Sequence, residues 1–215
     1  MKERVDIFLD KYRERMPDYL VDIETVAREN NIPVIGRGTG DLLRYALHSV
    51  EAERVLEIGT AIGFSALFMR EIIPEDGTIT TIEKIEARYS QAERNFQKYD
   101  KKNQITLLKE EAADAIVRLK EEGKTYHLIF LDAAKGQYIA FLPTLVDLLE
   151  VGGVLVSDNI FHNGTVMNSR YAVSQRDRTI HERLREYLQA ITEHEQFTSL
   201  ILPVDDGIAV SKKIR

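Results

Sequence analysis

The order of apolar and polar residues predicts a helical segment at the N-terminus. Three sets of apolar residues within positions 1–50 repeat at the helical spacing i, i+3, i+4: Val5, Phe8, Leu9 and Tyr12; Leu20, Ile23 and Ala27; Leu42, Leu43, Ala46 and Leu47. We therefore expect three helices, the second after Pro17 and the third over residues 39–49. These helices would form a cap on the rest of the chain. In an alternative interpretation, the cap also closes one side of a substrate pocket.

From Arg54 onward the pattern alternates between strands and helices. Strand-like runs occur at Arg54–Ile58, Thr78–Glu83, Gln104–Lys109, His127–Asp132 and Gly153–Ser157, and helical patterns separate them at Ser65–Ile73, Glu86–Tyr99, Ala112–Glu121 and Tyr138–Leu149. This alternation predicts a parallel sheet with right-handed crossovers. The run Leu128–Leu131 is continuously apolar, which is typical of a central parallel strand covered on both faces.

The last third of the chain has a different pattern. A long amphipathic helix is predicted by Ile180, Leu184, Tyr187, Leu188 and Ile191. Two strand-like runs, at 199–204 and 208–212, then flank Asp205-Asp206-Gly207, which is a strong hairpin signal. The prediction is a Rossmann-like α/β fold in which five parallel strands are completed by a C-terminal antiparallel hairpin. Residues 1–215 would form one domain, with a helical cap at 1–50 and the core at 51–215.

Composition and charge narrow the classes of protein. The chain of 215 residues contains no cysteine, which excludes disulfides, thiolate metal sites and cysteine nucleophiles. The net charge of −6 argues against binding to nucleic acid through a global basic field, although a local basic patch can serve the same purpose. The apolar stretches are too short to span a bilayer, so no membrane partner is expected and a cytoplasmic location is the default.

A cofactor site is predicted where the first strand runs into a glycine-bearing turn. Gly59 and Gly63 follow Glu57 there, and Glu83 ends the next strand 24 positions after Gly59. An acid at that distance is expected to bind ribose hydroxyls. A dinucleotide site would require G-x-G-x-x-G, whereas the spacing here is G-x-x-x-G. The pattern therefore favours a ligand with an ammonium group and no phosphate, and an unrelated turn remains the alternative.

Two further strand ends carry candidate metal ligands and a candidate base. Asp132 ends the fourth strand, and Asp158-Asn159 end the fifth. Ligands bind outside the carboxyl ends of strands in open α/β sheets, so these side chains should converge with Gly59. Three oxygen ligands favour Mg²⁺, Mn²⁺ or Ca²⁺ over Zn²⁺. Lys135 would face the same cavity as a neutral amine base. Taken singly, a strand-end aspartate is more often a cap and a lysine a solvated surface group.

These segments resemble the cation-dependent O-methyltransferases, which include catechol and caffeoyl-CoA O-methyltransferases. The resemblance rests on residues 56–65, 131–135 and 157–159, and it implies the seven-stranded methyltransferase sheet. It also implies S-adenosylmethionine as cofactor, Lys135 as catalytic base, a homodimer, and Asp132, Asp158 and Asn159 as ligands of Mg²⁺, Mn²⁺ or Ca²⁺. The implied cofactor contacts are Ile35, Glu57, Gly59, Ala61, Ser65, Glu83, Glu111, Ala112 and Asp132. Related sequences have Gly-Asp or Gly-Ala where this chain has Glu110-Glu111, which puts the adenine contacts in doubt.

Within the family, the chain is most similar to the bacterial tRNA 5-hydroxyuridine methyltransferases. The phrase Lys135-Gly136-Gln137-Tyr138 carries most of this likeness. It implies methylation of the wobble uridine in the tRNA anticodon region to 5-methoxyuridine, with Arg37, Arg170 and Arg176 as candidate phosphate contacts. Taken singly, each of these arginines is more often a solvated surface charge. The rival hypotheses are a small-molecule catechol-type methyltransferase, a non-catalytic cofactor-binding protein and a nicotinamide-dependent oxidoreductase.

Overall fold

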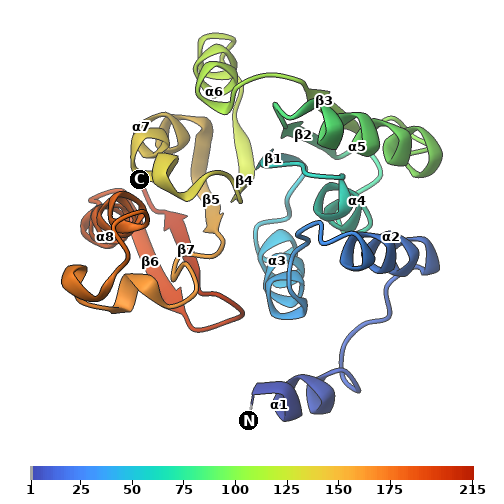
Figure 1. Cartoon of the computed structure of the whole chain (residues 1–215). Helices are drawn as coiled ribbons and strands as arrows, with labels where there is room; N and C mark the ends of the chain where they lie inside the picture. Colours follow the sequence, from blue (N-terminus) through green and yellow to red (C-terminus); the bar gives the residue numbers. More distant parts are fainter. Residues whose placement is uncertain (1) are drawn as a thin grey trace.

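A seven-stranded sheet forms the centre of the protein in the computed structural model, which describes residues 2–215 (Figure 1). Its strands are β1 (Arg54–Ile58), β2 (Thr78–Ile82), β3 (Ile105–Leu108), β4 (Tyr126–Leu131), β5 (Leu149–Ser157), β6 (Phe197–Leu202) and β7 (Ile208–Lys213). They lie in the order β3-β2-β1-β4-β5-β7-β6. Neighbours among β1–β5 pair in parallel, whereas β7 is antiparallel to both β5 and β6. The predicted fold class is confirmed.

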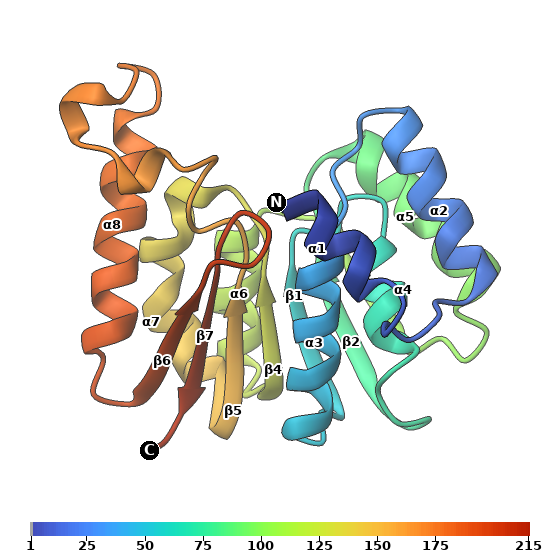
Figure 2. The same ribbon diagram turned by 90° about the horizontal axis from the view of Figure 1, so that it is seen from below.

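Helices cover both faces of this sheet (Figures 1 and 2). They are α1 (Lys2–Leu9), α2 (Asp18–Glu29), α3 (Arg37–Ser49), α4 (Phe64–Arg70), α5 (Glu86–Tyr99), α6 (Ala112–Glu121), α7 (Tyr138–Leu148) and α8 (Arg178–Glu193), with short 3₁₀ turns η1 (Lys135–Gln137), η2 (Thr165–Met167) and η3 (Arg170–Ala172). One core cluster joins the sheet to α2–α5, and a second joins its other face to α6–α8. No helix within residues 2–215 combines the length and the apolar character needed to cross a membrane.

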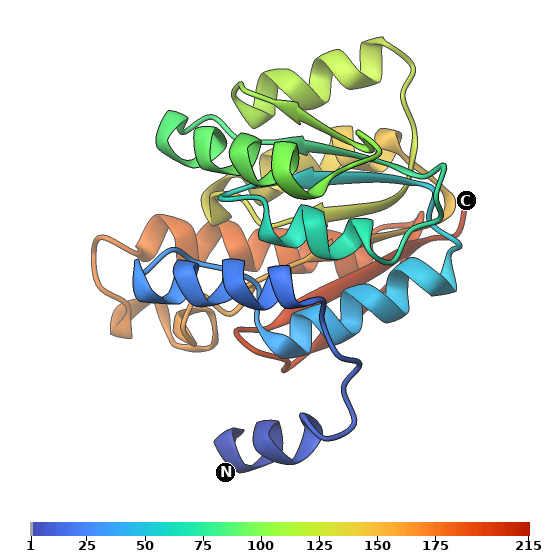
Figure 3. The same ribbon diagram turned by 90° about the vertical axis from the view of Figure 1, so that its right-hand side faces the viewer.

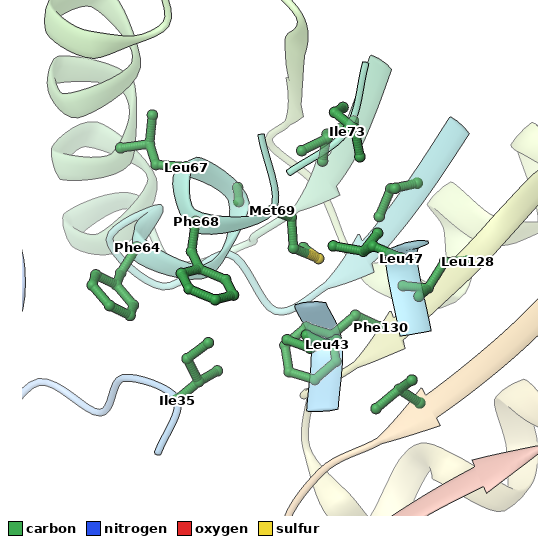
Figure 4. Close-up of a cluster of buried hydrophobic side chains, with 14 of the residues drawn as sticks. Ile35, Leu43, Leu47, Phe64, Leu67, Phe68, Met69, Ile73, Leu128 and Phe130 are labelled. Atoms are coloured by element: carbon green, nitrogen blue, oxygen red, sulfur yellow. The ribbon is translucent and has the colours of Figure 1, made fainter. Parts of the chain in front are cut away.

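Strand β4 stabilises the centre of the sheet by burying its side chains on both faces. Leu128 and Phe130 point into the cluster with α3 and α4 (Figure 4), while Ile129 and Leu131 point into the cluster with α6–α8. All four side chains have 0% exposure. At roughly 2 kcal/mol for each fully buried side chain, this strand alone contributes about 8 kcal/mol of hydrophobic stabilisation. The continuous apolar run was therefore a correct sign of a strand covered on both faces.

Helix α1 is the part of the cap that departs from expectation. Its predicted apolar face stays exposed, since Val5 is 49%, Phe8 56% and Tyr12 73% accessible. Figure 3 shows the helix standing away from the body of the protein. The helical spacing predicted the helix correctly, but it did not show whether another element covers its apolar face. In α2, by contrast, Leu20, Ile23 and Ala27 are buried as the pattern indicated.

Candidate active site

The carboxyl ends of β1, β2, β4 and β5 lie at one edge of the sheet. The register brings Ile58 beside Ile82 and Leu131, and Leu131 beside Ser157. The residues that follow these strands are Gly59, Glu83, Asp132 and Asp158. Because parallel neighbours end together, the predicted cofactor turn and the predicted cation ligands share this edge.

The turn after β1 is built by glycine for a reason internal to the fold. Gly59 has φ +109°, and a Cβ atom there would lie 2.1 Å from the backbone oxygen of Asp132. Gly63 has φ +83° and makes room for the Phe96 ring, which a Cβ would approach to 2.5 Å. Only glycine adopts these conformations without strain. The Gly59 turn therefore packs directly against the loop that carries Asp132. The predicted cofactor turn and the loop with a predicted cation ligand are in backbone contact.

Glu57 lies beneath this turn and is fully buried. Thr81 donates a hydrogen bond to its Oε2, whereas Oε1 has no partner among the described residues. Burial, together with the nearby carboxylates of Asp132 and Glu83, raises the pKa of Glu57 to about 7, although the hydroxyls of Ser65 and Thr81 act in the opposite direction. A buried carboxylate oxygen without a donor fits a ligand that brings a positive group to it.

Glu83 is placed to hold the turn and a ligand together. Its Oε2 accepts a hydrogen bond from the Ala61 amide at 3.1 Å, and its Oε1 accepts one from the Ile85 amide at 2.9 Å. Each carboxylate oxygen has a second lone pair, so both retain the capacity to accept from a ribose hydroxyl. Glu83 is 7% exposed, and the two amide hydrogen bonds hold its carboxylate in position.

The remaining predicted cofactor residues are distributed around this edge. Ser65 is 8% exposed in the first turn of α4. Ile35 is buried just before α3 and lines a small cavity with Met16, Phe64 and Phe68. At the far side, Glu111 is exposed and pairs with Lys84 at 3.0 Å, and Ala112 begins α6.

The predicted cation ligands come from adjacent strand ends. Asp158 is 2% exposed, and its Oδ1 accepts a hydrogen bond from the Asn159 amide at 2.7 Å. Burial raises the pKa of Asp158 to about 7, and the neighbouring charge of Asp132 acts in the same direction. Within residues 2–215, no group of three or more histidine, aspartate or glutamate side chains is arranged to hold a metal. A cation here would therefore depend on two carboxylates and the Asn159 amide, together with oxygens from water or substrate.

Lys135 lies in η1 directly beside Asp132. Its Nζ donates to Asp132 Oδ1 at 2.6 Å and to the Tyr138 hydroxyl at 3.1 Å. The lysine side chain is only 15% exposed, so it is held inside the site and not solvated at the surface. The alternative interpretation of Lys135 as a surface charge does not agree with this burial.

Tyr138 is a site residue to which sequence reasoning gave no role. It is completely buried, and its hydroxyl bonds to the backbone oxygens of Leu131 at 2.9 Å and Asp158 at 3.1 Å. Burial raises the pKa of Tyr138 well above its usual value, so the hydroxyl stays protonated. The spacing of three residues from Lys135 was the available signal, because it places both side chains on one side of the turn that leads into α7.

The three candidate phosphate-binding arginines lie on separate elements. Arg37 begins α3 and pairs with Glu24 at 3.2 Å. Arg170 lies in η3 and pairs with Glu182 at 3.7 Å, and Arg176 is exposed just before α8. The segment that carries Arg170 and Arg176 lies beside α8, away from α3 (Figure 2). Arg170 and Arg176 therefore share one segment of the chain, whereas Arg37 lies on a different element.

Comparison with known proteins defines the class to which this fold and site belong. The O-methyltransferase family profile matches residues 13–214. The chain belongs to the O-methyltransferase family.

Particular relatives agree with this assignment. The chain is 28% identical to caffeoyl-CoA O-methyltransferase 2 of Populus trichocarpa over 207 residues, which cover 94% of this chain and 84% of the relative. It is 28% identical to caffeoyl-CoA O-methyltransferase 1 of Arabidopsis thaliana, over 93% of this chain and 80% of that protein. Among solved structures, a putative caffeoyl-CoA O-methyltransferase from Staphylococcus aureus superimposes with a TM-score of 0.86 at 27% identity, covering 99% of this chain and 98% of the other.

A second solved structure shows the same fold at lower identity. The Podospora anserina methyltransferase PaMTH1, which was solved with S-adenosylhomocysteine bound, superimposes with a TM-score of 0.86 at 24% identity. The aligned region covers 100% of this chain and 95% of that protein.

Proposed function

We propose that this protein transfers a methyl group from S-adenosylmethionine to a hydroxyl group that lies next to a second oxygen, with the help of a divalent cation. The observation that carries the proposal is the shared edge at which Asp132, Asp158 and Lys135 meet the Gly59 turn. One half of this edge suits a positively charged cofactor, and the other half suits a hard cation with its oxygen ligands.

The cofactor half is supported by Glu57 and Glu83. Glu57 offers an unpartnered, buried carboxylate oxygen to the ammonium group of S-adenosylmethionine. Glu83 is fixed by two backbone amides and retains lone pairs for the ribose. The solved relative with bound S-adenosylhomocysteine has the same fold, which supports the same cofactor here. Ile35, Ala61, Ser65, Glu111 and Ala112 would complete the binding surface.

The cation half is supported by the chemistry of its donors. Asp132, Asp158 and Asn159 supply only oxygen ligands, which match Mg²⁺, Mn²⁺ or Ca²⁺. Burial, and secondly the charge of Asp132, raise the pKa of Asp158, so a bound cation would favour the ionised form of this carboxylate. A bound divalent cation would polarise the acceptor hydroxyl and would oppose the ammonium form of Lys135.

Lys135 is the residue that would move the proton. Its Nζ lies between Asp132 and the Tyr138 hydroxyl, which together fix its position. From there Lys135 would accept the proton of the acceptor hydroxyl as a general base. Glu57 and Glu83 would meanwhile hold the cofactor so that its methyl group faces the resulting oxyanion, and this alignment supplies much of the rate acceleration.

The substrate we favour is 5-hydroxyuridine at the wobble position of tRNA, which would become 5-methoxyuridine. Its hydroxyl lies beside the O4 carbonyl, so it offers the two adjacent oxygens that the cation half requires. Support comes from the likeness of residues 135–138 to the tRNA-modifying subfamily and from Arg170 and Arg176, which are exposed on one segment between β5 and α8. The family resemblance also supports a homodimer, which sedimentation velocity would test.

A small phenol or catechol is the second candidate substrate. Two observations favour it: the named relatives are caffeoyl-CoA O-methyltransferases, and Arg37 and Arg170 are already paired with acidic residues. The net charge of −6 points the same way, because it does not attract a polyanion.

One assay separates these candidates. The protein is incubated with methyl-labelled S-adenosylmethionine and Mg²⁺ or Mn²⁺, and with either hydroxyuridine-containing tRNA or catechol. Label in the tRNA supports the tRNA substrate, and label in catechol alone supports the small-molecule alternative. Failure to label either acceptor would contradict the proposed function.

A further inference from the structure

The turn between β6 and β7 reaches across the site edge to the first turn of α3. Asp205 lies in this turn, and its Oδ2 accepts hydrogen bonds from the Thr39 amide at 2.8 Å and the Thr39 hydroxyl at 3.0 Å. The two residues are 166 positions apart in the chain. The contact therefore fastens the C-terminal hairpin to the N-terminal cap at the active edge of the sheet.

This contact replaces the usual cap of the helix. Gly36 is the N-cap residue of α3 and has no side chain to accept from the first amides of the helix. Asp205 accepts instead, and a Cβ atom at Gly36 would lie 2.3 Å from its carboxylate. At Gly38 a Cβ atom would lie 2.5 Å from Val204. Both glycines thus leave space for the incoming turn.

Thr39 also faces a predicted cation ligand. Its hydroxyl oxygen lies 3.5 Å from Asp158 Oδ1, the same oxygen that accepts from the Asn159 amide at 2.7 Å. Thr39 is 0% exposed and Asp158 is 2% exposed, so bulk water has little access to the contact between them. Contacts that fix one carboxylate oxygen also orient the other, which is how residues behind a metal ligand influence binding.

We propose that Thr39 and Asp205 are positioning residues for Asp158, and that they increase the affinity of the site edge for a divalent cation. The Thr39 hydroxyl has one proton, which it shares between Asp205 Oδ2 and Asp158 Oδ1, so its oxygen bridges the two carboxylates and limits the rotation of Asp158. Asp205 also adds negative charge near Asp158. The inference rests on the proposed function in that it assigns a cation to Asp132, Asp158 and Asn159.

The test is direct binding of Mn²⁺ to the full chain by isothermal titration calorimetry, which needs no turnover. Thr39→Val removes the hydroxyl but keeps the shape of the side chain, and Thr39→Ser restores the hydroxyl. We expect Thr39→Val to weaken Mn²⁺ binding at least tenfold, in the range typical of residues that orient metal ligands, and Thr39→Ser to bind within about twofold of wild type. Asp205→Asn, which keeps the size of the side chain, should also weaken binding about tenfold.

A matched control distinguishes an effect on the orientation of Asp158 from a general effect on the stability of the fold. Asp100 is also a buried aspartate that accepts from a backbone amide, that of Ile105 at 2.9 Å, but it lies at the C-terminal end of α5 and binds the first residue of β3, at the opposite end of the sheet. Asp100→Asn should lower the melting temperature and leave Mn²⁺ affinity unchanged. Equal Mn²⁺ affinity in wild type and Thr39→Val would overturn the positioning role while leaving the proposed function intact. No Mn²⁺ binding by wild type would overturn the cation-dependent function and this inference together.

Discussion

Replacing Glu57 by glutamine tests how this buried carboxylate affects stability. The pKa of Glu57 rises from 4.5 to about 7 because the side chain is buried, with Asp132 and Glu83 adding to the effect. The folded chain therefore holds a proton that the unfolded chain releases, so stability is full below pH 4.5 and is lost as the pH rises to about 7. A difference of one pKa unit between the folded and unfolded chain corresponds to ~1.36 kcal/mol, so the loss of stability is about 3 kcal/mol.

Glu57→Gln removes this titration and keeps the shape of the side chain. We expect the free energy of unfolding of the variant, relative to wild type, to rise by about 3 kcal/mol between pH 5 and pH 8. Urea denaturation without cofactor at the two pH values measures this difference. Asp158 titrates in the same range in both proteins, so its contribution cancels. Parallel pH dependence in the two proteins would refute the reasoning.

The same variant should behave in the opposite way toward the cofactor. S-adenosylhomocysteine carries an ammonium group, and a hydrogen bond between charged groups contributes about 1.5–3 kcal/mol. Glu57→Gln should therefore weaken S-adenosylhomocysteine binding by roughly 10–100-fold, measured by calorimetry at pH 8. Unchanged affinity would show that Glu57 serves the fold alone.

Four further predictions concern other parts of the site. Lys135→Ala should lower kcat by about 10²–10⁴-fold and leave cofactor affinity nearly unchanged, because only proton transfer is lost; equal loss of both would contradict its role as base. Gly59→Ala should destabilise the fold by about 3 kcal/mol in urea denaturation, because its Cβ would meet the Asp132 oxygen. Chelation by EDTA should abolish methyl transfer, and added Mg²⁺ or Mn²⁺ should restore it; activity that persists in EDTA would exclude the cation. If tRNA is the substrate, Arg176→Ala should raise KM for tRNA and reduce its salt dependence, while turnover of a small catechol stays the same.

The fold was predictable because its strongest local signals agreed with its topology. The apolar run of β4 indicated a central strand, and the Asp205-Asp206-Gly207 turn indicated the hairpin of β6 and β7. Once parallel strands are expected, the residues at their carboxyl ends must lie together, which is why Asp132 and Asp158 were placed at one edge from the sequence alone.

What the sequence did not reveal depends on contacts between distant segments. Asp205 resembles an ordinary turn residue, and nothing local shows that it accepts from Thr39. Gly59 was predicted as part of a cofactor-binding turn, whereas the structure shows that the Asp132 backbone also requires a residue without a side chain there. The apolar spacing of α1 predicted a helix but not the exposure of its Val5 and Phe8 side chains.

The contact between Gly59 and the Asp132 loop has an evolutionary consequence. In the proposed function, this backbone contact would hold the cofactor turn at a constant distance from the loop that carries Asp132. New acceptors must then be accommodated by pieces that are not tied into it, such as α1 and residues 161–177. We expect enzymes of this kind to diversify at their periphery while the reacting geometry stays constant.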